Sequence, residues 1–82
     1  MDYPVSTADQ LSHVLKGARR QRKLTQAAVG EQIGLSQEAV SILERTPGAS
    51  SVGRLLNMLS ALGLEVVIRD KPRSGKAAKG EW

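Results

Sequence analysis

The sequence predicts a mainly α-helical, compact domain of four to five short helices followed by a single β-strand. Between residues 6 and 63, apolar residues recur at intervals of three and four, which is typical of amphipathic helices. Hydroxyl residues precede these stretches and glycines follow them, as they do at helix ends. We therefore expect a helical domain at 6–63 and a strand at 64–69, between a flexible N-terminus at 1–5 and a flexible basic tail at 70–82.

The first helix is expected to begin at Ser6 or Thr7 and to end near Gln21. Each of the two hydroxyl residues is followed three positions later by an acid or amide that completes a capping box, so the sequence leaves both open. Apolar residues at helical spacing define the inner face of this helix, and they are Leu11, Val14, Leu15 and Ala18.

The next two helices are predicted to form a tight corner. Thr25 and Ser36 are N-cap candidates, because apolar residues flank each of them at the spacing of a hydrophobic staple. Gly34 ends the first of the two helices, and only about three residues separate it from the second, so the helices must cross steeply. We expect the crossing to be filled by Val29, Ile33, Leu35, Val40 and Leu43.

This corner has the sequence pattern of a known family. TQ at 25–26, the small Gly30, and the sequence IG-L-S-Q, V-S and L-E from 33 to 44 resemble the lambda-repressor-like Xre group of DNA-binding proteins, over roughly residues 7–63. The resemblance implies a helix-turn-helix whose second helix reads DNA. It also implies an ion pair between Arg19 and Glu44, although both side chains could instead be exposed and unpaired.

The second helix of the corner carries the candidates for DNA contact. Gln37, near its start, is the first choice for a base contact, because a glutamine amide can pair with adenine N6 and N7. Gln26, which begins the preceding helix, is expected to reach a phosphate. Ile42 departs from the polar or basic residue that the family often has. The other residues expected at DNA are Ser36, Glu38, Ala39, Ser41 and Arg45.

The charge distribution also favours a polyanionic partner. The chain has a net charge of +4 and a pI near 10.0, and its basic residues are bunched at 16–23 and 69–79. Such runs are often only solvated faces, but their position beside a helix-turn-helix favours double-stranded DNA.

The last helix is expected to follow a loop at 46–50. Proline, glycine and hydroxyl residues predict the loop, Ser50 or Ser51 caps the helix, and Gly63 ends it. Its apolar residues are expected to make the largest single contribution to the core, and they are Val52, Leu55, Leu56, Leu59 and Leu62.

The predicted strand has no partner within the chain, because no other segment of the sequence resembles a strand. Its simplest partner is the same strand of a second copy, which gives an intersubunit two-stranded sheet in a homodimer. The alternative is that the segment continues the helix or coils over the core. The residues assigned to dimerisation are Leu64, Val66, Val67 and Ile68.

The predicted strand and the tail together narrow the family resemblance to one branch of the Xre group. A helical body, a strand after the last helix and a basic tail ending in Glu-Trp are similar to HipB-type antitoxins. The resemblance implies a repressor that binds a palindromic operator, regulates its own operon and binds a HipA-like serine/threonine kinase toxin through Trp82. The alternatives are a stand-alone phage-type or restriction-modification controller repressor, and a protein-interaction module without a DNA role.

Other function classes find little support. The chain has no cysteine and one histidine, and it lacks a metal-ligand cluster and a phosphate-binding glycine loop. We therefore expect no enzyme activity, catalytic residue, metal, cofactor or small-molecule substrate. No apolar run is long enough to span a membrane, and we expect a cytoplasmic, nucleoid-associated protein.

Overall fold

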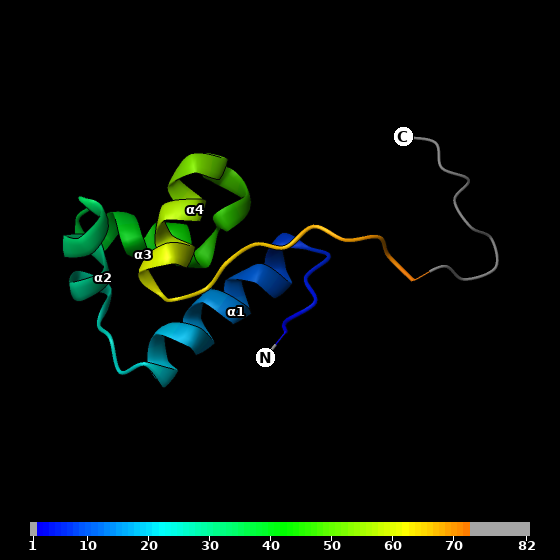
Figure 1. The fold of residues 1–82 in the computed structure, drawn as a ribbon. Coiled ribbons are helices and arrows are strands. Elements are labelled where there is room, and N and C mark those ends of the chain that lie inside the picture. The colour runs from blue at the N-terminus through cyan, green and yellow to red at the C-terminus, as the bar shows by residue number, and fades with distance from the viewer. Residues whose placement is uncertain (1, 73–82) are drawn as a thin grey trace.

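The structure is a computed structural model that describes residues 2–72 of the 82-residue chain. Its elements are α1 (Ala8–Gln21), α2 (Gln26–Ile33), α3 (Gln37–Arg45), the short 3-10 helix η1 (Pro47–Ala49) and α4 (Val52–Ala61). Figure 1 shows α2, α3 and α4 grouped together, with α1 beside them. The prediction of a mainly helical domain is confirmed.

Each α-helix begins at a hydroxyl residue whose side chain accepts a backbone N–H from three residues further on. The capping residues are Thr7, Thr25, Ser36 and Ser51, with donor–acceptor distances of 3.0–3.1 Å. Of the alternatives left open by the sequence, the structure selects Thr7 for α1 and Ser51 for α4. In α1, the side chain of Gln10 accepts from the backbone of Ser6 at 2.6 Å, so both hydroxyl residues take part in the cap.

The turn between α2 and α3 depends on two glycines. Gly34 has a φ of +74°, which is the left-handed conformation that glycine adopts without a steric penalty. Gly30 is buried where the two helices approach each other, and its carbonyl oxygen accepts the N–H of Leu35 at 2.9 Å. A Cβ on Gly30 would lie well inside the contact distance of the Leu35 carbonyl oxygen. A residue without a side chain is therefore needed at this crossing.

The core lies where α2, α3 and α4 meet α1. Two predictions for α4 were wrong, since Val52 is 70% exposed and Leu56 is 45% exposed, whereas Met58 is fully buried. Apolar spacing defines a stripe on a helix, but the neighbouring helices here cover only part of the stripe. The loop at 46–50 also contributes, because Pro47 in η1 is buried. The buried apolar residues are Leu15, Ala18, Val29, Val40, Leu43, Met58, Leu59 and Leu62.

The segment after α4 forms no strand within the described residues. Gly63 turns the chain with a φ of +73°, and Figure 1 shows an extended chain from there to residue 72. Leu64 is partly buried against the core, and Arg69 Nη2 lies 3.5 Å from Asp2 Oδ2 near the N-terminus. A strand requires a second strand for its hydrogen bonds, and the structure contains a single chain.

One further prediction concerns Trp82 and the basic tail, and another concerns membrane-spanning helices. Trp82 and most of the basic tail lie outside the described residues, and so does Met1. Among the described helices, none has both the length and the apolar character that crossing a membrane requires.

Candidate nucleic-acid interface

Helix α3 has one face in the core and one face in solvent. Val40, Leu43 and Glu44 are buried, whereas Gln37 and Glu38 at its start are exposed. The spacing of the buried positions places the opposite face outward along the whole helix. Of the other predicted DNA-contact residues, Ser36 and Arg45 are exposed and Ala39 and Ser41 are half-buried; the adjacent Ile42 is 53% exposed.

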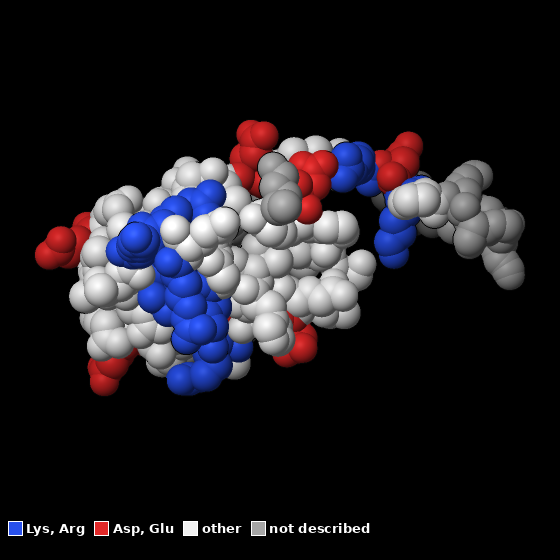
Figure 2. Space-filling view, turned by 90° about the horizontal axis from the view of Figure 1, so that it is seen from below, with Lys and Arg blue, Asp and Glu red and all other residues white. Residues whose placement is uncertain are grey.

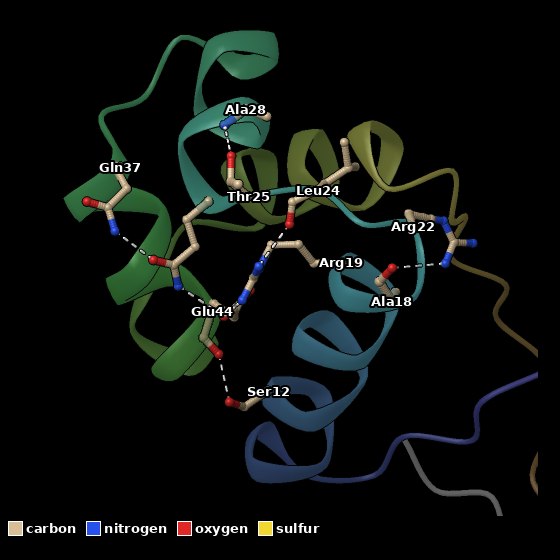
Figure 3. Close-up of polar contacts among 10 residues, drawn as sticks. Ser12, Ala18, Arg19, Arg22, Leu24, Thr25, Ala28, Gln37 and Glu44 are labelled. Carbon is tan, nitrogen blue, oxygen red and sulfur yellow. Dashed lines mark hydrogen bonds and ion pairs between the residues drawn. The ribbon is translucent and has the colours of Figure 1, made fainter.

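The first residues of α2 and α3 are joined through their side chains. The Nε2 group of Gln37 donates to Oε1 of Gln26 at 2.8 Å. The Nε2 group of Gln26 in turn donates to Oε1 of Glu44 at 3.1 Å (Figure 3). The two glutamines that the sequence assigns to a base and to a phosphate are thus brought together. The link to Glu44 was not predicted, because no local pattern indicates a contact between residues on different helices.

Glu44 also binds α1, so its carboxylate connects three helices. Arg19 donates from Nε to Glu44 Oε2 at 2.6 Å and from Nη2 to Oε1 at 3.2 Å. The third nitrogen, Nη1, donates to the carbonyl oxygen of Leu24 at 2.9 Å, and Ser12 Oγ donates to the backbone oxygen of Glu44 at 2.6 Å. The ion pair implied by the family resemblance is therefore confirmed, and it is bidentate.

The environment keeps this carboxylate ionised. Burial by itself raises the pKa of Glu44, but hydrogen bonds from Arg19 and Gln26 and the positive charges of Arg19 and Lys16 outweigh burial, and the pKa lies below its ordinary value. The pKa of Arg19 is raised, chiefly by its hydrogen bond to Glu44. The group that orients Gln26 is thus a charged acceptor.

Basic residues surround the start of α2. Figure 2 shows Lys and Arg side chains gathered in a band on the face seen from below. The end of α1 and the turn after it supply exposed Lys16, Arg20, Arg22 and Lys23. An open depression lies at the start of α2. Arg20 and Thr25 line it, and the sequence had not indicated either residue as part of the interface. Its lining residues are Arg19, Arg20, Lys23, Leu24, Thr25, Gln26, Ala27 and Gln37.

This arrangement suits a negatively charged backbone next to a groove. The backbone N–H groups at the start of α2, the positive end of its dipole and the basic side chains all favour phosphate. Gln37, at the rim of the same depression, projects an amide from the start of α3, where a helix in the major groove meets base edges. The fold and the site therefore define a helix-turn-helix DNA-binding protein.

Comparison with known proteins agrees with this class. The profile of a family described as "Helix-turn-helix domain" matches residues 10–71, which is more than half of the chain. The chain belongs to this helix-turn-helix domain family. No curated protein matches the chain.

Solved structures of HipB are similar to the fold. A complex of a HipB variant with the O2 20mer has a TM-score of 0.81 at 25% identity, and the alignment covers 88% of this chain and 100% of that chain. The HipA-HipB-O2-O3 complex has a TM-score of 0.79 at 25% identity, over 84% of this chain and 97% of that chain. The resemblance to HipB-type proteins of the Xre group is thereby confirmed.

Proposed function

We propose that this DNA-binding regulator is a transcriptional repressor that binds a palindromic operator as a homodimer and acts as the antitoxin of a HipA-like serine/threonine kinase. The observation that carries the proposal is the polar start of α3. There Gln37 is exposed and held by Gln26, on a fold that aligns with a HipB complex at a TM-score of 0.81.

In the proposed complex, α3 lies in the major groove with Gln37 at a base pair. The major groove is about 12 Å wide and admits one helix. Gln37 pairs with adenine, and Glu38 can accept from cytosine N4. Ser36 can donate to a phosphate or a base while its oxygen caps α3, and Ala39 and Ser41 are half-exposed at the edge of the same face. Arg45, exposed at the other end of α3, adds attraction to the DNA backbone.

The phosphate next to Gln37 is proposed to occupy the open depression at the start of α2. Gln26 has a second Nε2 hydrogen that can donate to a phosphate oxygen, since only one is used by Glu44 within the described residues. The basic side chains around it make the attraction long-ranged. Affinity should therefore fall steeply as salt is added, by nearly one unit of log K per unit of log salt for each phosphate neutralised.

Exposed apolar residues support the proposed homodimer. Val66, Val67 and Ile68 are 54%, 65% and 93% exposed in the single chain, and Val52 and Leu56 of α4 are also exposed. A contiguous run of exposed apolar residues such as 66–68 marks an association site. We propose that residues 66–68 pair with the same segment of a second copy, and that Leu64 anchors the start of the segment on its own subunit.

The kinase partnership rests on family resemblance. The similarity to the HipA-HipB-O2-O3 complex supports a kinase partner for this chain, and Trp82 is the proposed contact. Bound to the dimer, the kinase would be held in a non-productive conformation, and the complex would repress its own operon.

Two measurements test the proposal. Selection of binding sites from random duplex DNA should yield a palindrome with half-sites roughly 10 base pairs, or a multiple, apart. Gln37→Ala should remove the preference at one pair in each half-site, whereas Gln32→Ala, an exposed glutamine of α2 outside the interface, should not. Co-purification with the kinase of the same operon should be lost with Trp82→Ala. Operator binding without kinase binding would favour a stand-alone controller.

A further inference from the structure

Helices α1, α2 and α4 end in the same way. After each of them the chain passes through one residue with a positive φ, at Lys23 (+55°), Gly34 (+74°) and Gly63 (+73°). A leucine follows each of these residues, and its backbone N–H donates to a carbonyl oxygen five positions earlier at 2.8–3.1 Å. In this left-handed helix ending the residue with the positive φ is commonly glycine. Lys23 therefore occupies a glycine position.

The lysine carries a conformational cost that the two glycines avoid. In the left-handed conformation the Cβ of an L-residue crowds its own backbone, and glycine has no Cβ. Among residues 2–72, Lys23 is the only residue other than glycine with a positive φ. Its side chain does not offset the cost, because it is exposed and takes part in no hydrogen bond or ion pair within the described residues. Such an outlier at a surface indicates a functional demand.

The surroundings of Lys23 show what this demand is. Lys23 lines the open depression at the start of α2, together with two arginines. The nitrogens of Arg19 are already used, because they donate to Glu44 and to the carbonyl oxygen of Leu24. Arg20 and Lys23 are thus the two cationic side chains of the depression that make no ion pair in the described part of the chain. A glycine at position 23 would leave Arg20 alone.

We propose that Lys23 binds, through its ammonium group, the DNA phosphate that occupies this depression, and that it stands in place of glycine for this contact. The inference rests on the proposed function and names one contact within its phosphate site. An ammonium is a compact charge on a flexible stem, so it can reach a phosphate from a fixed backbone position. A phosphate contact carries no sequence information, so Lys23 strengthens binding to every duplex by a similar factor. The gain in affinity is coupled to a loss in stability.

The first measurement compares four replacements of Lys23 in the full-length protein by thermal unfolding. Lys23→Gly and Lys23→Asn remove the charge and introduce a residue that tolerates the left-handed conformation. Lys23→Gln removes the charge and keeps the backbone cost, and Lys23→Arg keeps both. At one protein concentration, Lys23→Gly should raise Tm by about 4–8 °C, and Lys23→Gln and Lys23→Arg should leave it unchanged.

The second measurement follows operator binding as a function of salt. A dimer that loses two phosphate contacts should show a slope of log K against log salt that is smaller by roughly 1.8, which at about 0.1 M salt is a loss of affinity of about 60-fold. The three neutral variants should show this loss on operator and on random duplex alike, and Lys23→Arg should not. The matched control is Lys71→Gln, which removes the same charge from an exposed position outside the depression and should leave the slope unchanged.

Each outcome supports or overturns one step. A higher Tm with an unchanged salt slope in Lys23→Gly would overturn the phosphate contact, and so would an equal loss of slope in Lys71→Gln. An unchanged or lower Tm in Lys23→Gly would overturn the argument from backbone conformation. Failure of the proposed function is distinguishable, since Gln37→Ala would then change the base preference at no position while Lys23→Gln still weakened binding to any duplex.

Discussion

Replacement of Gly30 by alanine tests the close approach of α2 and α3 at the level of one carbon atom. The added Cβ would press on the carbonyl oxygen of Leu35 and lie 3.3 Å from Cγ2 of Val40. Both neighbours belong to the turn and helix that follow, so relief requires α3 to move away from α2. The substitution should therefore destabilise the protein and also displace the helix that is proposed to read DNA.

The expected magnitude combines two opposing effects. Overpacking of a filled interior costs about 3 kcal/mol at the upper end of the usual range, which applies because the nearest obstacle is backbone. Alanine in a helix is favoured over glycine by about 1 kcal/mol. The net loss in the free energy of unfolding is thus about 2 kcal/mol, which corresponds to a decrease in Tm of roughly 8–16 °C for a domain of this size.

Gly17 provides the matched control. It lies within α1 and is exposed, and a Cβ added there would meet no other element of the described chain within 4 Å. Gly17→Ala should raise stability by about 1 kcal/mol, because only helix propensity changes. Urea unfolding of both variants at one protein concentration compares them directly. If Gly30→Ala is stabilised as much as Gly17→Ala, the close crossing of α2 and α3 is refuted.

Four further variants examine the ion pair and the exposed apolar segment. Glu44→Ala leaves Arg19 without its buried partner and should cost about 3–5 kcal/mol in urea unfolding, whereas Glu38→Ala on the exposed face should change stability by about 0.5 kcal/mol or less. Because folding lowers the pKa of Glu44, its ionised form contributes to the free energy of unfolding. This contribution is fully present above about pH 4.3, the pKa of a glutamate in the unfolded chain, and it is lost as the pH falls through the folded pKa. Acid titration of Glu44→Gln should lack this loss. Ile68→Lys, at a position 93% exposed in the single chain, should leave the subunit folded but weaken self-association in sedimentation equilibrium, and an unchanged dimer would contradict pairing through residues 66–68.

Local signals in the sequence predicted the helix ends well. Thr25 and Ser36 act as caps through bonds to residues three positions away, and Gly34 ends α2 through its own φ angle. Such features depend on neighbours in the chain, so the sequence displays them directly. The turn between the two helices could be located to the residue for this reason.

Predictions about burial and long-range contacts were less complete. Val52 and Leu56 have the spacing of core residues, but whether a helix face is covered depends on the size of its neighbours, which spacing does not reveal. The bond between Gln26 and Glu44 joins residues 18 positions apart and has no local sign. The ion pair with Arg19 was expected only because a related pattern was recognised.

The division of α3 into an inner and an outer face has an evolutionary consequence. Glu38, Ile42 and Arg45 are exposed, so duplicated genes can exchange these residues and acquire new target sites with little penalty in folding. Gln37 is different, since its amide is joined to the interior through another helix. Paralogues that descend from this chain should therefore diverge first at the three exposed positions and last at the glutamine.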